Sequence, residues 1–332
     1  MLDQAVELVE VSARDGLQNE GTSFSTEQKI ELIRRCTEVG LKRIEVASFV
    51  NPGRVPAMAD GEAVVEGLVA RADVSYIGLV LNRRGLERAL ATGVNEINFA
   101  FAATETFNQR NQGASVAESV KVAGEIVAEA HRHGLRTTIT VGAAFGCPFE
   151  GEVPVDRTTT LALDVAGTGV DEIAIADTIG VGVPSDVSRR IAAIRDAVGS
   201  VALRCHFHDT RNTAVANAQA AVAEGVRALD GSLGGLGGCP FAPGATGNVA
   251  TEDLLYLLER SGLPTGVSHT LVRRASRWLA EQLGRPLPSA LSRADWFPVP
   301  SQLKEDDART YEPSERRDRE RFQRREQIHD RT

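Results

Sequence analysis

Two histidines separated by one residue, His206 and His208, are the clearest candidates for metal ligands in this sequence. They end a short apolar stretch, ALRCHFH (202–208), whose composition is typical of a β-strand. Side chains at positions i and i+2 of a strand point to the same side, so both imidazoles could bind one ion. A single histidine in a strand is more often a hydrogen-bonded core residue, and the pair alone leaves both interpretations open.

Asp15 and Asn248 could complete this site, because they follow the first and last predicted strands of a closed barrel and would lie beside the histidines. Two imidazoles, one carboxylate and one amide oxygen form a mixed nitrogen and oxygen site with room for water or substrate. Such a site suits Mg²⁺ or Mn²⁺ better than structural zinc. The alternatives are a turn residue for Asp15 and a helix cap for Asn248.

Three further charged residues are candidates for the same site. Arg14 could stabilise negative charge on a thioester oxygen, or it could form an ordinary salt bridge. Glu45 in RIEVAS (43–48) and Asp177 in EIAIAD (172–177) are carboxylates in apolar strands, where an unpaired charge is costly. We expect both to orient Arg14, a metal-bound water or a histidine, with a structural ion pair as the alternative.

A glycine-rich segment, SLGGLGGCPFAPGATGNVATED (232–253), surrounds Cys239. Its small residues would allow it to close over a ligand and exclude water. A thiol near a metal and Arg14 could have a lowered pKa and transfer a proton to a carbanion. The alternative for Cys239 is a small buried hydrophobic residue. Cys147, in AAFGCPFEG (143–151), has a similar setting, and we interpret it as a packing residue.

The elements that would position these residues are parallel strands. Eight short apolar runs alternate with longer helical patterns, as in a parallel sheet with crossover helices. Eight such units in about 250 residues predict an α/β fold of the (β/α)8 TIM-barrel type, with the chemistry at the carboxyl ends of the strands. A doubly wound open sheet is the alternative, although no GxGxxG follows the first strand. The predicted strands are 6–12, 43–48, 74–81, 96–101, 136–142, 172–177, 202–208 and 227–234.

Composition narrows the possible partners and locations. The 332 residues carry a formal net charge of −8, which argues against a nucleic-acid-binding protein. We see no targeting pattern at the N-terminus and no apolar run long enough to span a membrane, so we expect a cytoplasmic protein without a membrane partner. The scattered cysteines predict neither a zinc knuckle nor a disulfide scaffold. We predict a TIM-barrel domain at 1–287 and a charged, flexible or partly helical C-terminal tail at 288–332.

Several motifs together resemble those of 3-hydroxy-3-methylglutaryl-CoA lyases, within a wider group of metal-dependent TIM-barrel lyases and Claisen-type synthases. The resemblance spans roughly residues 5–285. The segment around Cys239 is the most specific motif, because the condensing synthases lack this cysteine loop. The motifs are VSARDGLQNE (11–20), IEVASFVNPGRVPAMAD (44–60), GCPFEG (146–151), ADTIGVGVP (176–184), HFHDT (206–210) and GGLGGCPFAPGATGNVATED (234–253).

This resemblance implies a retro-Claisen cleavage that uses a divalent metal, Mg²⁺ or Mn²⁺. A base removes the proton of the tertiary hydroxyl, the carbon–carbon bond breaks to release acetoacetate, and the acetyl-CoA enolate is then protonated. Arg14 would stabilise the enolate and Cys239 would handle the proton. The implied metal ligands are Asp15, His206, His208 and Asn248, and the implied catalytic residues are Arg14, Cys239, Glu45, Asp177 and His206.

Departures from the family pattern leave the acyl group open. Gly21, the run Arg211-Asn212-Thr213 and FNQRNQGAS (107–115) are unusual, so a bulkier 3-hydroxy-3-alkylglutaryl-CoA or a citramalyl-type thioester remains an alternative substrate. Arg84 and Arg110 could contact the CoA phosphates, with surface solubility as the alternative. A Claisen condensing enzyme and a catalytically silent metal-binding barrel are the competing functions, and the Cys239 loop favours the lyase. We expect a homo-oligomer, with a dimer as the predicted form.

Overall fold

The computed structural model describes residues 5–238, 247–294 and 296–297, and every structural statement below concerns these residues. Contacts divide the chain into a compact unit from Met1 to Ala294 and a second unit from Asp295 to Thr332. The following description is of the first unit. Among the described helices, none is long and apolar enough to cross a membrane.

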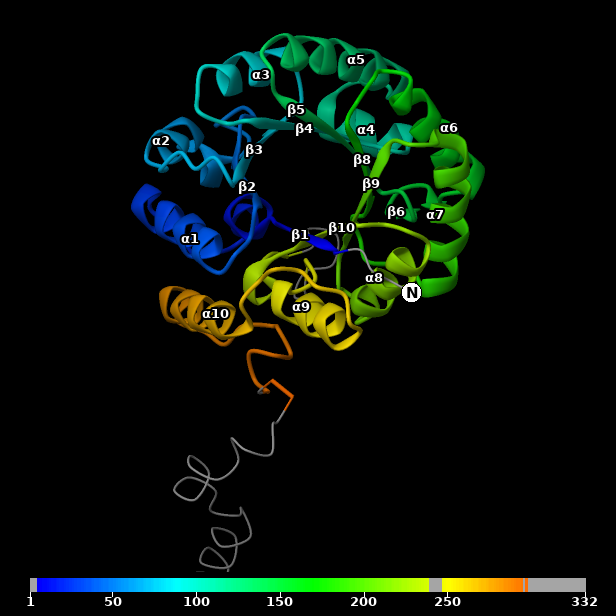
Figure 1. The fold of residues 1–332 in the computed structure, drawn as a ribbon. Helices are drawn as coiled ribbons and strands as arrows, with labels where there is room; N and C mark the ends of the chain where they lie inside the picture. Colours follow the sequence, from blue (N-terminus) through cyan, green and yellow to red (C-terminus); the bar gives the residue numbers. More distant parts are fainter. Residues whose placement is uncertain (1–4, 239–246, 295, 298–332) are drawn as a thin grey trace, which may run out of the picture. The chain divides into compact units, whose positions relative to one another are not determined.

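Eight parallel strands form a closed barrel in the order β1-β10-β9-β8-β5-β4-β3-β2. Figure 1 shows these strands inside a ring of helices. The predicted TIM barrel is confirmed, and an open sheet is excluded because β1 pairs with both β2 and β10. The strands are β1 (Glu7–Glu10), β2 (Arg43–Ser48), β3 (Ser75–Val80), β4 (Glu96–Ala102), β5 (Arg136–Gly142), β8 (Glu172–Asp177), β9 (Ala202–Phe207) and β10 (Ala228–Gly231).

The helices begin and end where local residue chemistry predicts. Ser25 caps α1 through a capping box with Gln28, in which each side chain accepts the other residue's backbone N–H. Gly40 follows α1 and adopts φ 106°, and a Cβ added to Gly40 would lie 2.6 Å from the Gly266 carbonyl oxygen. The helices are α1 (Thr26–Glu38), α2 (Gly61–Glu66), α3 (Arg83–Leu90), α4 (Glu105–Gln112), α5 (Val116–Arg132), α6 (Val155–Ala166), α7 (Pro184–Val198), α8 (Ala214–Ala223), α9 (Thr251–Arg260) and α10 (His269–Leu283).

Strands β1 and β10 end two and three residues earlier than the sequence predicts. β1 ends at Glu10 because Ser12–Gly16 form a π-helical turn, η1, which carries Arg14 and Asp15. β10 ends at Gly231 because Leu233–Gly235 form a 3₁₀ turn, η3, in which Gly234 adopts φ 70°. At the carboxyl end of the barrel, where the chemistry is expected, a tight turn therefore follows each of these two strands.

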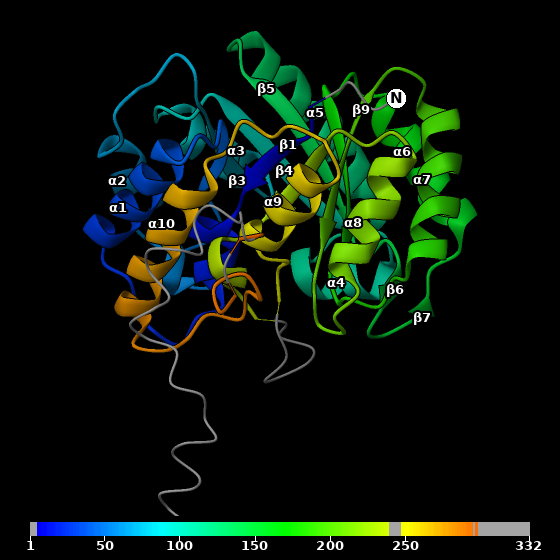
Figure 2. The ribbon, with the colours of Figure 1, turned by 60° about the horizontal axis from the view of Figure 1, so that its bottom comes forward.

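A small hairpin and α4 lie at one end of the barrel. The hairpin pairs β6 (Gly146–Cys147) with β7 (Gly151–Glu152), and Figure 2 shows it at the same end as α4. Cys147 is buried, and its sulfur accepts a hydrogen bond from Thr104 Oγ1 at 3.0 Å. This contact agrees with the packing role that we predicted for Cys147.

The barrel interior contains a buried ion-pair network that the sequence analysis did not predict. The guanidinium of Arg43 bonds Glu172 at 2.8 and 3.0 Å and also binds Glu96. Arg204 approaches the same Glu172 carboxylate at 3.2 Å. Buried charges are stable only when they are paired, so we expect the contacts of these four residues, the Arg43 network, to maintain the fold. The members are Arg43, Glu96, Glu172 and Arg204.

Candidate active site and metal centre

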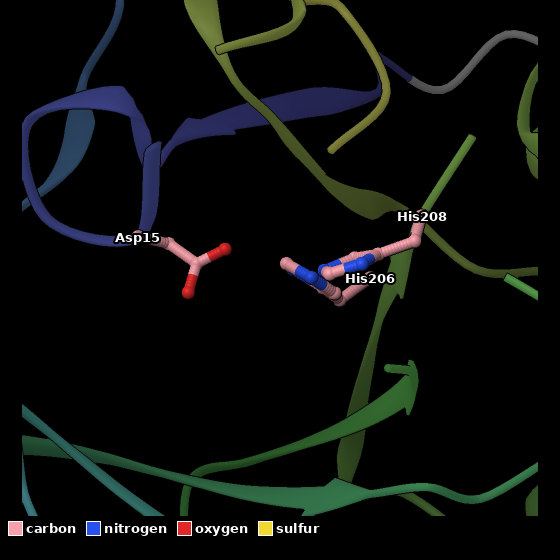
Figure 3. Close-up of side chains that lie close together, drawn as sticks. All are labelled: Asp15, His206 and His208. Atoms are coloured by element: carbon pink, nitrogen blue, oxygen red, sulfur yellow. The ribbon is translucent and has the colours of Figure 1, made fainter. Parts of the chain in front are cut away.

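Three potential metal ligands converge at the carboxyl end of the barrel. Asp15, His206 and His208 each offer a ligand atom, and these atoms all lie within 4.8 Å of one another. Figure 3 shows the Asp15 carboxylate pointing toward the two imidazoles. The strand order explains this meeting, because β10 lies between β1, which leads into Asp15, and β9, which carries His206.

Asn248 lies beside these three residues and contacts two of them. Its Nδ2 donates to Asp15 Oδ2 at 2.8 Å and to the Leu236 carbonyl at 3.2 Å, and its backbone forms a bridge with His208. Helix α9 begins at Thr251 with Ala250 at its N-cap position, so Asn248 is not the cap of this helix. The four residues Asp15, His206, His208 and Asn248 are called the metal cluster below.

Unsatisfied polar atoms indicate that the metal cluster fits a cation. Asn248 Oδ1 and His208 Nδ1 are buried and have no hydrogen-bond partner among the described residues. Buried acceptors without donors are costly, and a bound cation would satisfy them. A donor set of one carboxylate, two imidazoles and one amide oxygen is also suitable for a divalent ion. These residues therefore fit the metal that the sequence implies.

The charge states of Asp15 and His208 favour cation binding at neutral pH. The pKa of His206 is shifted the other way: although burial opposes it, the hydrogen bond to Asp230 raises this pKa. Although burial opposes it, Arg14 and the two histidines lower the pKa of the Asp15 carboxyl well below its usual range. Burial, followed by the charge of His206, lowers the pKa of His208 to about 4. Asp15 is thus ionised and His208 is neutral at pH 7, and these are the forms that bind metals.

Arg14 is held beside the cluster by two carboxylates. Its Nε donates to Glu45 Oε2 at 2.6 Å and its Nη1 donates to Asp15 Oδ1 at 2.6 Å. Glu45 is fixed in turn by Asn98 Nδ2 at 2.8 Å, and Thr140 Oγ1 donates to Asn98 Oδ1 at 2.8 Å. The guanidinium is therefore oriented by a chain of contacts from three strands, which favours a fixed binding direction for an oxyanion.

Asp177 has a different environment from Glu45. Its buried carboxylate accepts the backbone N–H groups of Val181 at 3.0 Å and Gly182 at 2.8 Å. Burial raises the pKa of Asp177, and these two hydrogen bonds oppose the shift. Glu45 and Asp177 were predicted to orient Arg14, a metal-bound water or a histidine. Glu45 forms an ion pair with Arg14, and Asp177 organises the loop that follows β8, so the catalytic role of Asp177 stays a prediction.

A cavity of about 480 Å³ opens beside the metal cluster. Arg14, Asp15 and both histidines line it, and apolar side chains such as Leu79 and Phe107 line other parts of its wall. A polar floor with apolar walls suits an acyl thioester, whose charged oxygens and alkyl chain need different surroundings.

The arginines that we predicted for CoA binding do not line this cavity. The Arg110 guanidinium lies over the ring of Phe149, 4.3 Å from its centroid, and Arg84 is exposed away from the lining residues. Arg54, which the sequence analysis did not nominate, is the arginine that lines the cavity together with Arg14.

Cys239 lies outside the described residues, but both ends of its segment are defined. Gly237 adopts φ 122°, and an added Cβ there would lie 2.8 Å from Asn248 Nδ2. On the other side, a Cβ at Gly247 would lie 2.9 Å from the backbone nitrogen of Gly238. The segment therefore begins and ends next to the metal cluster, and glycine is needed for this close approach.

The family model described as HMGL-like matches residues 5–279 of the chain. The chain belongs to the HMGL-like family. The resemblance to 3-hydroxy-3-methylglutaryl-CoA lyases that the motifs predicted is thereby confirmed.

Relatives of this HMGL-like chain are similar along most of their lengths. A hydroxymethylglutaryl-CoA lyase of Bacillus subtilis is 40% identical over 284 residues, which cover 86% of this chain and 95% of the relative. An (R)-citramalyl-CoA lyase of Chloroflexus aurantiacus is also 40% identical, over 88% of this chain and 95% of the relative.

Solved structures agree with the sequence comparison. The crystal structure of the Bacillus subtilis HMG-CoA lyase matches with a TM-score of 0.86 and 39% identity, over 88% of this chain and 98% of that chain. An HMG-CoA lyase from Acinetobacter baumannii, in complex with coenzyme A and 3-methylmalate, matches with a TM-score of 0.83 and 38% identity, over 89% and 98%.

One departure from the usual HMGL-like pattern has a clear structural basis. Asn212 adopts φ 55°, a conformation that asparagine tolerates better than most residues other than glycine. The neighbouring Arg211 donates from Nη1 to the carbonyls of Ile179 at 2.9 Å and Gly180 at 2.8 Å. This arginine therefore links the loops that follow β8 and β9.

Four residues near the site were not nominated from the sequence: Asn98, Thr140, Asp230 and Arg54. Asp230 carries the same signal as Glu45 and Asp177, a carboxylate in an apolar strand, so that criterion could have found it. Asn98 and Thr140 are ordinary polar residues in predicted strands and give no such signal. Arg54 lies inside the motif IEVASFVNPGRVPAMAD, but nothing in its residue type distinguishes it from other arginines.

Proposed function

We propose that the protein is a carbon–carbon lyase that cleaves 3-hydroxy-3-methylglutaryl-CoA to acetyl-CoA and acetoacetate. The observation that carries this proposal is the placement of the metal cluster and Arg14 around one cavity. The similarity to hydroxymethylglutaryl-CoA lyases over most of both chains supports it.

The proposed chemistry divides between a metal and the side chains of this protein. Mg²⁺ or Mn²⁺, held by Asp15, His206, His208 and Asn248, would supply positive charge that orients the substrate oxygens and acidifies the tertiary hydroxyl. After a base removes the hydroxyl proton, the bond between C2 and C3 breaks and its electron pair moves to C2 and the thioester oxygen. Arg14, fixed by Glu45, stabilises this negative charge.

Cys239 is the proposed proton donor to C2 of the enolate, because both ends of its segment lie beside Asn248. We expect Cys239→Ala to reduce turnover by at least about 100-fold, the usual contribution of a general acid, while divalent-metal affinity stays unchanged. Turnover and Mn²⁺ binding are the two measurements. Cys147→Ala is the matched control, since it removes a thiol from another loop, and it should leave turnover close to wild type. Wild-type turnover in Cys239→Ala would contradict the role.

The substrate is tested by incubating the protein and Mg²⁺ with separate hydroxyacyl-CoA thioesters and identifying the products by mass spectrometry. We expect acetoacetate and acetyl-CoA from 3-hydroxy-3-methylglutaryl-CoA. The alternative is a citramalyl-CoA lyase, which the equally similar Chloroflexus aurantiacus relative favours, and it would give pyruvate instead. A 3-alkyl group longer than methyl would give the correspondingly longer keto acid. The proposal would be overturned if the protein cleaved none of these thioesters and catalysed only a condensation.

We infer that the anionic CoA portion of the substrate contacts Arg54, because this arginine lines the cavity and Arg84 and Arg110 do not. The cytoplasmic location, the dimeric assembly and the domain boundary at residue 287 stay predictions from the sequence.

A further inference from the structure

One imidazole of the metal cluster has a charged partner that the proposed mechanism does not use. Asp230 lies on β10, whose register with β9 pairs Ala228 with Arg204 and so brings Asp230 level with His206. Asp230 Oδ2 lies 3.0 Å from His206 Nδ1, and the Asp230 side chain is buried with 8% of its area exposed. Its position inside the barrel thus gives it a direct contact with a proposed ligand.

The other oxygen of Asp230 connects this contact to the Arg43 network. Asp230 Oδ1 lies 3.4 Å from Arg204 Nη1, and Arg204 lies 3.2 Å from Glu172 Oε1. Arg204 is only 1% exposed, so its charge is not screened by solvent. A line of contacts therefore runs from Glu172 through Arg204 to Asp230, whose second oxygen contacts His206.

The two histidines of the cluster differ in the partner of their Nδ1 atoms. His206 Nδ1 contacts a carboxylate, whereas His208 Nδ1 is buried without a hydrogen-bond partner. A neutral imidazole has one N–H, and a carboxylate beside Nδ1 places that hydrogen on Nδ1 and leaves Nε2 as the free ligand atom. His208 has no such constraint on its ring.

We infer that Asp230 is a positioning residue that fixes the His206 ring, with Nδ1–H donating to Asp230 and Nε2 directed at the cation. The charge of Arg204, 3.4 Å from Asp230 Oδ1, stabilises the ionised form of this carboxylate. This inference rests on the proposed metal site, and it predicts that loss of Asp230 weakens the site without removing a ligand.

The first test measures Mn²⁺ binding to Asp230→Asn, by electron paramagnetic resonance of the free ion, and thermal unfolding of the same samples. Asparagine keeps the shape of aspartate but not its charge, and we expect Mn²⁺ affinity to fall about 10- to 100-fold. Glu96→Gln is the matched control, since Glu96 is also a fully buried carboxylate paired with an arginine inside the barrel. It should lower the unfolding temperature and leave Mn²⁺ affinity at the wild-type value.

The second test does not depend on a metal. Imidazole ¹⁵N resonances report which ring nitrogen carries the hydrogen, and the chain has six histidines, few enough to assign by substitution. We expect the neutral His206 ring, observed at alkaline pH, to be an Nδ1–H tautomer in the metal-free wild type and a mixture in Asp230→Asn. An Nε2–H tautomer in the wild type, or wild-type Mn²⁺ affinity in a folded Asp230→Asn, would overturn the inference. Failure of the wild type to bind Mn²⁺ would instead overturn the proposed metal site.

Discussion

The barrel contains two groups of buried charges: the central guanidinium of one is fully hydrogen-bonded, whereas two potential ligand atoms of the other have no hydrogen-bond partner. In the Arg43 network, the guanidinium of Arg43 bonds Glu96 and Glu172 through all three of its nitrogens. In the metal cluster, Asn248 Oδ1 and His208 Nδ1 have no partner among the described residues, and every member of the cluster except Asn248 lines a cavity. Charges that satisfy one another stabilise the fold, whereas unsatisfied atoms beside a cavity indicate a ligand site.

The largest expected effect comes from removing a charge of the metal cluster. Asp15→Asn keeps the side-chain shape but loses the anionic ligand, and turnover should fall about a thousandfold or more, because several kcal/mol of charge stabilisation depend on the ion. Its unfolding temperature should stay near the wild-type value. Chelator-treated wild type should likewise be inactive, with recovery on addition of Mg²⁺ or Mn²⁺. Full activity in metal-free buffer would show that turnover does not depend on a bound ion, and it would contradict the role that separates the metal cluster from the Arg43 network.

The converse change removes a charge of the Arg43 network. Arg43→Met leaves Glu96 without its arginine partner and leaves Arg204 as the buried cation beside Glu172, so the free energy of unfolding should decrease by about 3 to 5 kcal/mol. The kcat of the folded molecules should stay close to wild type. Urea denaturation and active-site-normalised turnover measure the two quantities. Arg71→Met, which breaks an exposed pair with Asp73, is the control and should cost about 1 kcal/mol or less. An equally small effect of Arg43→Met would contradict the assigned structural role.

Acid pH offers a milder way to disrupt the same network. Although burial opposes it, the charges of Arg204 and Arg43 lower the pKa of Glu172 from 4.5 to about 2. A folded-state pKa below the unfolded value means that this stabilisation is present above about pH 4.5 and is lost as the pH falls toward 2. The difference in unfolding free energy between wild type and Glu172→Gln should therefore shrink over this range. Urea titrations at several pH values measure it, and a constant difference would show that Glu172 is not the titrating group.

The smallest expected effect concerns the arginine at the cavity. Arg54→Ala should raise the KM for the acyl-CoA substrate about fivefold with little change in kcat, because a partly solvated ionic contact contributes about 1 kcal/mol. Arg84→Ala and Arg110→Ala serve as matched controls, since neither residue lines the cavity. Steady-state kinetics of the three variants measure the effect. If KM increased more for Arg84→Ala or Arg110→Ala than for Arg54→Ala, the result would support the prediction from the sequence that this residue contacts the CoA phosphates.

Most of the fold could be predicted from the sequence, because local patterns determine strands and helices. The boundaries of β2, β5 and β8 match the predicted ranges, and the alternation of strand side chains placed His206 and His208 on one side. The turns after β1 and β10 were missed, since a short turn such as Ser12–Gly16 has no period that separates it from a strand end.

The assignment of buried charges was harder for a geometric reason. Glu45, Glu96, Glu172, Asp177 and Asp230 all read as single carboxylates in apolar strands. Their depth in the barrel depends on the stagger between neighbouring strands, which the sequence does not show. Only the register distinguishes Glu45 beside Arg14 from Glu172 beside Arg43.

The π-helical turn after β1 has a consequence for how the site works. In an extended strand, consecutive residues face opposite sides, but in this turn Arg14 and Asp15 both line the cavity and contact each other at 2.6 Å. The cation for the enolate and the anion for the metal thus come from one dipeptide. Because one peptide bond joins their backbones and an ion pair joins their side chains, these two charges keep a nearly constant separation.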